Sequence, residues 1–105
     1  MNQDVKKVIL HSQNGYDAKH DELLQRLISE KILLFCAIGR DCELWHDIMD
    51  ELDVMDELSV ANDEGRDFFM ITTWHEDESL DEVVKFAKSY DIEGIDNEQV
   101  RIIEV

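Results

Sequence analysis

Three histidines and one cysteine are the residues whose types and spacing could bind a metal ion. Cys42 and His46 are four residues apart, so on a helix both side chains would lie on one face. His11 and His75 each lie at or just beyond the end of a predicted strand. Thiolate and imidazole are the groups that zinc prefers in tetrahedral sites, so the four residues form a candidate zinc site. The alternative is that the histidines are solvated or lie as caps near helix N-termini.

Cys42 alone could also act as a nucleophile, because a thiol in the first turn of a helix can have a lowered pKa. Its neighbours Asp41 and Glu43 carry negative charge and oppose the thiolate. The chain has no Cys-x-x-Cys motif, no glycine-rich dinucleotide loop and no phosphate-binding P-loop. We therefore assign no catalytic residue, and the sequence favours a protein that is not an enzyme and needs no cofactor other than the zinc considered above.

The charge is strongly negative and unevenly distributed. The chain has 26 Asp and Glu residues against 10 Lys and Arg residues, a net charge of −16. Residues 41–65 carry ten carboxylates and no Lys or Arg. A field of this sign repels phosphate backbones and anionic membranes, so we expect neither a nucleic-acid nor a membrane partner. It attracts cationic surfaces, so we expect a basic protein partner.

Acidic residues near the start of a helix are stabilised by the helix dipole, which accounts for part of this charge. Acids further along a helix repel one another when they are three or four residues apart. A run of acids that repel one another indicates either a solvated helix face or selection for binding. Trp74 lies in a predicted polar loop and could serve as an aromatic anchor beside these acids. The candidate partner-binding residues are Glu43, Asp47, Asp50, Glu51, Asp56, Glu57 and Trp74.

The apolar pattern predicts strands alternating with helices. Residues 5–11, 32–38, 68–73 and 100–105 are predicted strands. Helices are predicted to begin at Asp17, at Asp41 and, through the capping box Ser79 to Glu82, at residue 80. The second helix ends near Asp53 or reaches Leu58, and residues 57–61 could instead form an extra antiparallel strand.

This order predicts a single α/β domain over residues 1–105, with a four-stranded, mainly parallel sheet and three helices on its two faces. It is a Rossmann-like or flavodoxin-like three-layer arrangement, for which we predict the strand order 2-1-3-4. The predicted core includes Val8, Leu10, Leu34, Cys36, Phe69 and Ile71. The element order resembles that of response-regulator receiver domains. Those domains need an acidic pair after the first strand and an aspartate at the end of the third. This chain has His11-Ser12 and Thr72-Thr73 at those positions, so the function of receiver domains is not assigned to it.

Two functional hypotheses follow. The first is an acidic binding module that docks onto a basic protein, as immunity, inhibitor or adaptor proteins do. The second is a small metal-binding protein or enzyme that uses the His and Cys cluster. The start of the sequence has no cationic region followed by an apolar stretch, which predicts a cytoplasmic protein. Cys36 lies within an apolar run and Cys42 in a polar setting, so we expect the two in opposite environments and both reduced. We expect a monomer or a weak homodimer.

Overall fold

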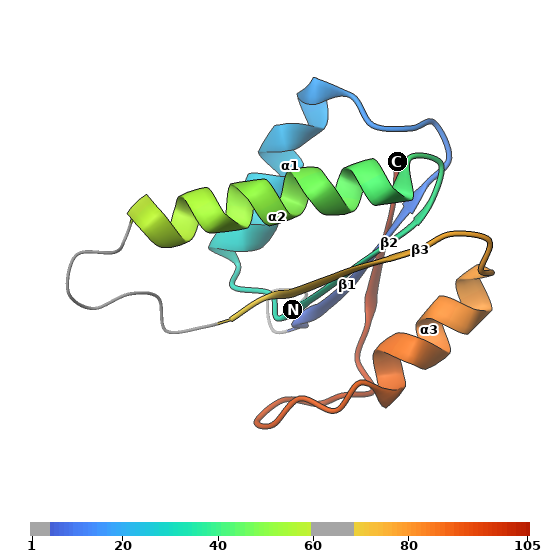
Figure 1. The fold of residues 1–105 in the computed structure, drawn as a ribbon. Helices are drawn as coiled ribbons and strands as arrows, with labels where there is room; N and C mark the ends of the chain where they lie inside the picture. Colours follow the sequence, from blue (N-terminus) through green and yellow to red (C-terminus); the bar gives the residue numbers. More distant parts are fainter. Residues whose placement is uncertain (1–4, 60–68) are drawn as a thin grey trace.

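One sheet of four parallel strands organises the chain, with helices on both faces (Figure 1). The computed structural model describes residues 5–59 and 69–105. The strands are β1 (Lys7–Ser12), β2 (Leu34–Gly39), β3 (Ile71–His75) and β4 (Arg101–Glu104). The helices are α1 (Asp21–Ser29), preceded by a 3-10 turn (Ala18–His20), α2 (Cys42–Ser59) and α3 (Leu80–Ser89). The α/β class, the parallel pairing and the three helices are confirmed.

The strand order is β3-β2-β1-β4, so the predicted order 2-1-3-4 is wrong. A central strand has both faces covered, so most of its positions are apolar. β2 meets this condition, because its first five residues are buried. β3 has the sequence Ile-Thr-Thr-Trp-His, with only its last residue buried, and it lies at an edge. All four strands are parallel, and the point at which the strand order reverses lies between β1 and β4, rather than between the first and third strands as the predicted order implied.

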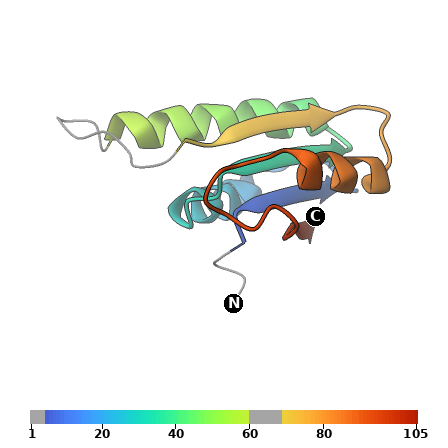
Figure 2. The same cartoon turned by 90° about the horizontal axis from the view of Figure 1, so that it is seen from below.

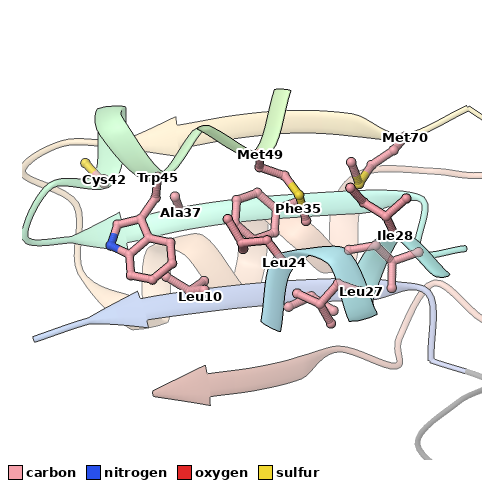
Figure 3. Close-up of a cluster of buried hydrophobic side chains, with 12 residues drawn as sticks. Leu10, Leu24, Leu27, Ile28, Phe35, Ala37, Cys42, Trp45, Met49 and Met70 are labelled. Carbon is pink, nitrogen blue, oxygen red and sulfur yellow. The ribbon is translucent and has the colours of Figure 1, made fainter. Parts of the chain in front are cut away.

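Right-handed crossovers in this order place α1 and α2 on one face of the sheet and α3 on the other (Figures 1 and 2). Each face has its own buried cluster. Under α1 and α2, Leu10 and Phe35 from the sheet meet Leu24 and Trp45 from the helices (Figure 3). Under α3, alternate residues of the same two strands, Ile9, Leu34, Cys36 and Ile38, meet Val83 and Ala87.

The predicted core is confirmed in four of its six positions. Val8, Leu10, Leu34 and Cys36 are fully buried, and Ile71 is half-buried at the edge strand. Phe69 is 75% exposed, because β3 begins only at Ile71 and Phe69 precedes the sheet. Phe68, the predicted first residue of this strand, lies outside the described residues.

The helix ends follow their local sequence. Asp17 caps the 3-10 turn through its Oδ1, which accepts from the Lys19 amide, and α1 begins at Asp21 rather than at Asp17. The predicted capping box at α3 is present, with Ser79 and Glu82 each accepting from the other's backbone amide. α2 continues to Ser59, so residues 57–59 are helical and not an antiparallel strand; residues 60 and 61 lie outside the described part. Of the described helices, none is both long and apolar enough to cross a membrane.

Lys7 joins β1 to the C-terminal end of α3. Its side chain is 0% exposed, and its Nζ donates to the carbonyl oxygens of Ala87 at 2.5 Å, Tyr90 at 2.6 Å and Asn97 at 3.2 Å. Burial lowers the pKa of this ammonium, an effect that the carboxylate of Asp91 partly offsets. A cation at a helix C-terminus also interacts favourably with the helix dipole. Lys7 therefore fixes the end of α3 and the loop that leads to β4.

We predict that Lys7→Met lowers the free energy of unfolding by about 2–3 kcal/mol, because it removes hydrogen bonds from a charged donor and leaves buried carbonyls without that partner. Chemical denaturation followed by circular dichroism measures the loss. The matched control is Lys88→Met, which removes an exposed charge from the last turn of the same helix and should cost less than about 1 kcal/mol. Equal losses in the two variants would show that Lys7 acts through general charge alone.

Candidate functional site

The four residues of the candidate zinc site do not come together, because they lie on opposite faces of the sheet. Cys42 is buried in the cluster under α1 and α2, and the ring of His46 lies on Trp74, with 4.6 Å between ring centroids. His75, next to Trp74 in β3, points to the other face, where its ring packs on Phe86 of α3.

His11 shares the face of His75. It pairs in register with Ile38 of β2, which in turn pairs with His75, so Ile38 stands between the two histidines. The Nδ1 atom of His11 is 3.8 Å from a carboxylate oxygen of Glu104. Across residues 5–59 and 69–105, no group of three or more His, Cys, Asp or Glu side chains is placed to hold a metal ion.

Both cysteines are free and buried, and they lie in the buried clusters on opposite faces of the sheet. The polar setting expected for Cys42 is wrong, since its side chain is 3% exposed. Burial raises the pKa of Cys42 and raises that of Cys36 to about 11. Both groups are therefore neutral thiols at physiological pH, and a neutral thiol is a poor nucleophile and a poor metal ligand.

A hydroxyl, an imidazole and a carboxylate line up at the end of β3, an arrangement that sequence reasoning missed. His75 Nε2 is 2.9 Å from Thr73 Oγ1, and His75 Nδ1 is 3.0 Å from Glu78 Oε2. The spacing Thr-x-His-x-x-Glu is the signal that could have revealed it. In enzymes with a nucleophilic hydroxyl, the hydroxyl, an imidazole base and a carboxylate follow one another in this order. Here, however, the His75 side chain is only 7% exposed, and the Phe86 ring packs on it. The chain of contacts ties the end of β3 to the turn before α3.

The end of β1 and the loop after it are tied to the start of α2 by hydrogen bonds. Ser12 Oγ accepts from the indole Nε1 of Trp45 at 2.9 Å, and an Asp41 carboxylate oxygen accepts from the Tyr16 amide at 3.0 Å. Gly39 is required opposite, since it has φ +95° and a Cβ there would lie 2.2 Å from the Ser12 carbonyl oxygen. The β1–β4 ladder continues past the strand ends, where the amide of Gln13 donates to Val105. Contacts within the chain thus occupy the carboxyl ends of β1, β2 and β4, beside the point where the strand order reverses.

The acids of α2 lie mainly on its solvent-exposed side. Glu43, Asp47, Asp50, Glu51 and Glu57 are exposed, as predicted, and we call these five the acidic face. Asp56 is half-buried and lies between α1 and α2 instead. The spacing of Leu44, Trp45, Ile48, Met49 and Leu52 predicts an apolar stripe opposite the acids, but Leu44 is 43% exposed and lies outside the buried side. The buried side of the helix is formed by Trp45, Met49 and, one turn further, Asp53.

Trp74 adjoins the acidic face through His46. The Trp74 side chain is 43% exposed and rests on the His46 ring. The Nδ1 atom of His46 is 3.0 Å from Asp47 Oδ1. An exposed aromatic ring and a row of carboxylates therefore form one continuous surface along α2 and the outer strand β3, which lie side by side (Figure 2).

We expect the melting temperature to be the same with excess zinc and with chelator, because the four candidate ligands are divided between two faces of the sheet. Differential scanning fluorimetry of the wild type and of Cys42→Ser tests this. A zinc-dependent rise in the wild type that Cys42→Ser abolishes would contradict the separation of these residues.

A second prediction concerns the Tyr16 hydroxyl, which donates to the Asp21 carboxylate. This hydrogen bond raises the pKa of Tyr16 from 10 to about 12. A group with a raised pKa in the folded state contributes stability below its unfolded pKa, and that contribution is lost as the pH rises through its folded pKa. Urea denaturation should therefore show stability falling between pH 10 and pH 12, and Tyr16→Phe should remove this part of the fall. Absorbance titration that places Tyr16 at its ordinary pKa would contradict the contact.

Comparison with known proteins gives one match. No curated protein and no solved structure is detectably similar to the chain. A domain of unknown function, DUF7684, matches residues 2–105, which is nearly the whole sequence. Because this match spans nearly the whole chain, the chain belongs to the DUF7684 family.

Proposed function

We propose that this protein is a cytoplasmic acidic binding module, and that the acidic face together with Trp74 docks onto a basic protein. The observation that carries the proposal is the exposed row of carboxylates on α2 beside an exposed tryptophan. Complementary charge speeds the encounter of two proteins, and aromatic residues often provide much of the binding energy once they have met. The acidic face and Trp74 would supply these two contributions.

The cost of the arrangement supports a binding role. Asp47 lies three or four residues from Glu43, Asp50 and Glu51, so it takes part in three repulsive pairs. Each pair costs roughly 0.2–0.5 kcal/mol on a helix surface. Asp47 and Asp50 lie beyond the first turn of α2, where the helix dipole gives little compensation. Apart from the contact between Asp47 and His46, folding alone does not favour these charges.

The alternative function, a metal-binding protein or enzyme that uses His11, Cys42, His46 and His75, finds less support. Its residues are divided between the two faces, and its thiol is neutral and buried. The docking surface needs no such convergence. A docking module requires exposed, complementary groups, and these are the features that α2 and β3 present.

The test replaces three acids of the acidic face: Asp47→Asn, Asp50→Asn and Glu51→Gln together. Stability should stay the same or rise by up to about 1 kcal/mol as the repulsive pairs are removed. The association rate with a basic protein retained from native extract at low salt should fall about tenfold or more and lose much of its salt dependence. Surface plasmon resonance at two salt concentrations measures both effects.

The control makes the same change in net charge elsewhere. Glu22→Gln, Asp81→Asn and Glu93→Gln neutralise three exposed acids outside α2. If the acidic face is the docking surface, this variant should associate at nearly the wild-type rate. Equal slowing in both triple variants would mean that net charge alone drives the association, and unchanged binding in the α2 variant would refute the proposal.

A further inference from the structure

One edge of the sheet has backbone hydrogen-bonding groups that point outward. β3 is an edge strand, and within the part of the chain that the structure describes it pairs with β2 alone. The Ile71 amide donates to the Leu33 carbonyl oxygen at 2.9 Å, so the odd-numbered residues of β3 direct their backbone groups towards β2. Because these groups alternate along a strand, the N–H and C=O groups of Thr72 and Trp74 point away from β2. Such outward groups are a template for pairing with another chain.

The side chains of β3 give this edge little protection against pairing. Edge strands usually carry charged residues or proline, which discourage the addition of another strand. β4, at the opposite edge, has Arg101 and Glu104 among its four residues. β3 has the sequence Ile-Thr-Thr-Trp-His, without Lys, Arg, Asp, Glu or Pro. Of the two edges, β3 is therefore the one suited to accept a further strand.

The contact between His46 and Trp74 shows which acids of α2 lie nearest to this edge. The two ring centroids are 4.6 Å apart, so the side of α2 that carries His46 faces β3. Glu43 lies three residues before His46 and Asp50 four residues after it, so both share that side of the helix. Both are exposed, and we call these two residues the edge acids. Negative charge therefore lies along the outer side of β3.

The two faces of β3 differ in what an added strand would meet. Successive side chains of a strand point to opposite faces. Trp74 lies on the face of α2 and the edge acids, whereas Ile71 packs against the cluster under α3. Phe69, two residues before Ile71, is 75% exposed. A strand added at this edge would thus meet carboxylates with one set of alternate side chains and apolar groups with the other.

We propose that the outer edge of β3 binds an extended segment of the basic partner as a fifth strand, in which basic side chains alternate with apolar ones. Backbone hydrogen bonds to Thr72 and Trp74 would hold the segment, and its basic side chains would meet the edge acids. A second copy of this chain is disfavoured there, because each copy has a net charge of −16. The inference rests on the proposed docking function and names the kind of segment that docks.

The direct test titrates a capped heptapeptide of alternating lysine and valine, with lysine at both ends, into ¹⁵N-labelled protein. Hydrogen exchange at the Thr72 and Trp74 amides should slow several-fold or more, because these N–H groups become hydrogen-bonded. A peptide of the same composition, with its lysines and valines in two blocks, should bind more weakly and give no such protection.

Three outcomes of this titration would overturn the proposal. The first is equal binding of the alternating and block peptides, and the second is binding that leaves exchange at Thr72 and Trp74 unchanged. In both cases charge alone would explain the association. The third is slow exchange at both amides before any peptide is added, since the edge would then already be occupied.

Variants of α2 locate the added strand. Glu43→Gln with Asp50→Asn removes the edge acids and should weaken binding of the alternating peptide about three- to tenfold, the effect of losing two exposed ion pairs. Asp47→Asn with Glu51→Gln makes the same change in charge, at positions turned roughly 100° and 140° around the helix from His46. This second double variant should weaken binding less. Equal weakening by the two would show that the peptide does not lie along β3.

The strand addition and the docking function can fail separately. Thr72→Pro removes an outward N–H and leaves the bonds to β2 in place, since proline is tolerated on edge strands. It should weaken binding of the peptide and of the basic protein at least tenfold, with circular dichroism to check the fold. If the variant does not fold, the two double variants decide the question.

The comparison with the triple α2 variant separates the two proposals. If folded Thr72→Pro binds the basic protein like the wild type while the triple α2 variant does not, the docking function stands and the strand addition is refuted. If neither variant affects that binding, the docking function itself is refuted.

Discussion

The Lys7 ammonium is buried, where a positive charge is destabilising unless it is hydrogen-bonded. The positions of the end of α3 and of the loop that follows it depend on its hydrogen bonds. Three backbone carbonyls, from the end of α3 and from the loop beyond it, converge on Nζ. The same loop is braced by Asn97, whose side chain bonds both backbone groups of Ile92. The contact fixes where the chain leaves α3 and turns towards β4. Because β4 pairs with β1, the strand that carries Lys7, one side chain links the helix, the loop and the edge strand.

Local patterns predicted the elements of this fold, but not the order of the strands. The capping box at Ser79 and the apolar run of β2 are short-range signals, and both gave correct elements. Strand order depends on which strands can be covered on both faces, and the polar threonines of β3 were the available clue to an edge position. Phe69 misled the prediction because an aromatic residue next to a strand looks like core, whereas here it lies outside the sheet.

The candidate site was harder to predict, because it depends on which way each side chain points. His75 and Trp74 are neighbours in sequence, yet one packs on α3 and the other on His46 of α2. A strand sends successive side chains to opposite faces, so residues collected at one edge of a sheet need not meet. The acids of α2 were predicted more successfully, since helical spacing alone places most of them on one side. Asp56 is the exception, because its position depends on how α1 packs against α2.

The acidic face and Trp74 would make different physical contributions to the proposed docking. Exposed charges on the acidic face act over about 10 Å at moderate salt, so they would affect the rate and orientation of encounter. Exposed ion pairs contribute little to affinity, because water screens them. The Trp74 ring, exposed beside the acidic face, would supply the short-range contact that slows dissociation. In the proposed function, long-range attraction and a short-range aromatic contact are therefore complementary, and α2 and the neighbouring strand β3 carry them.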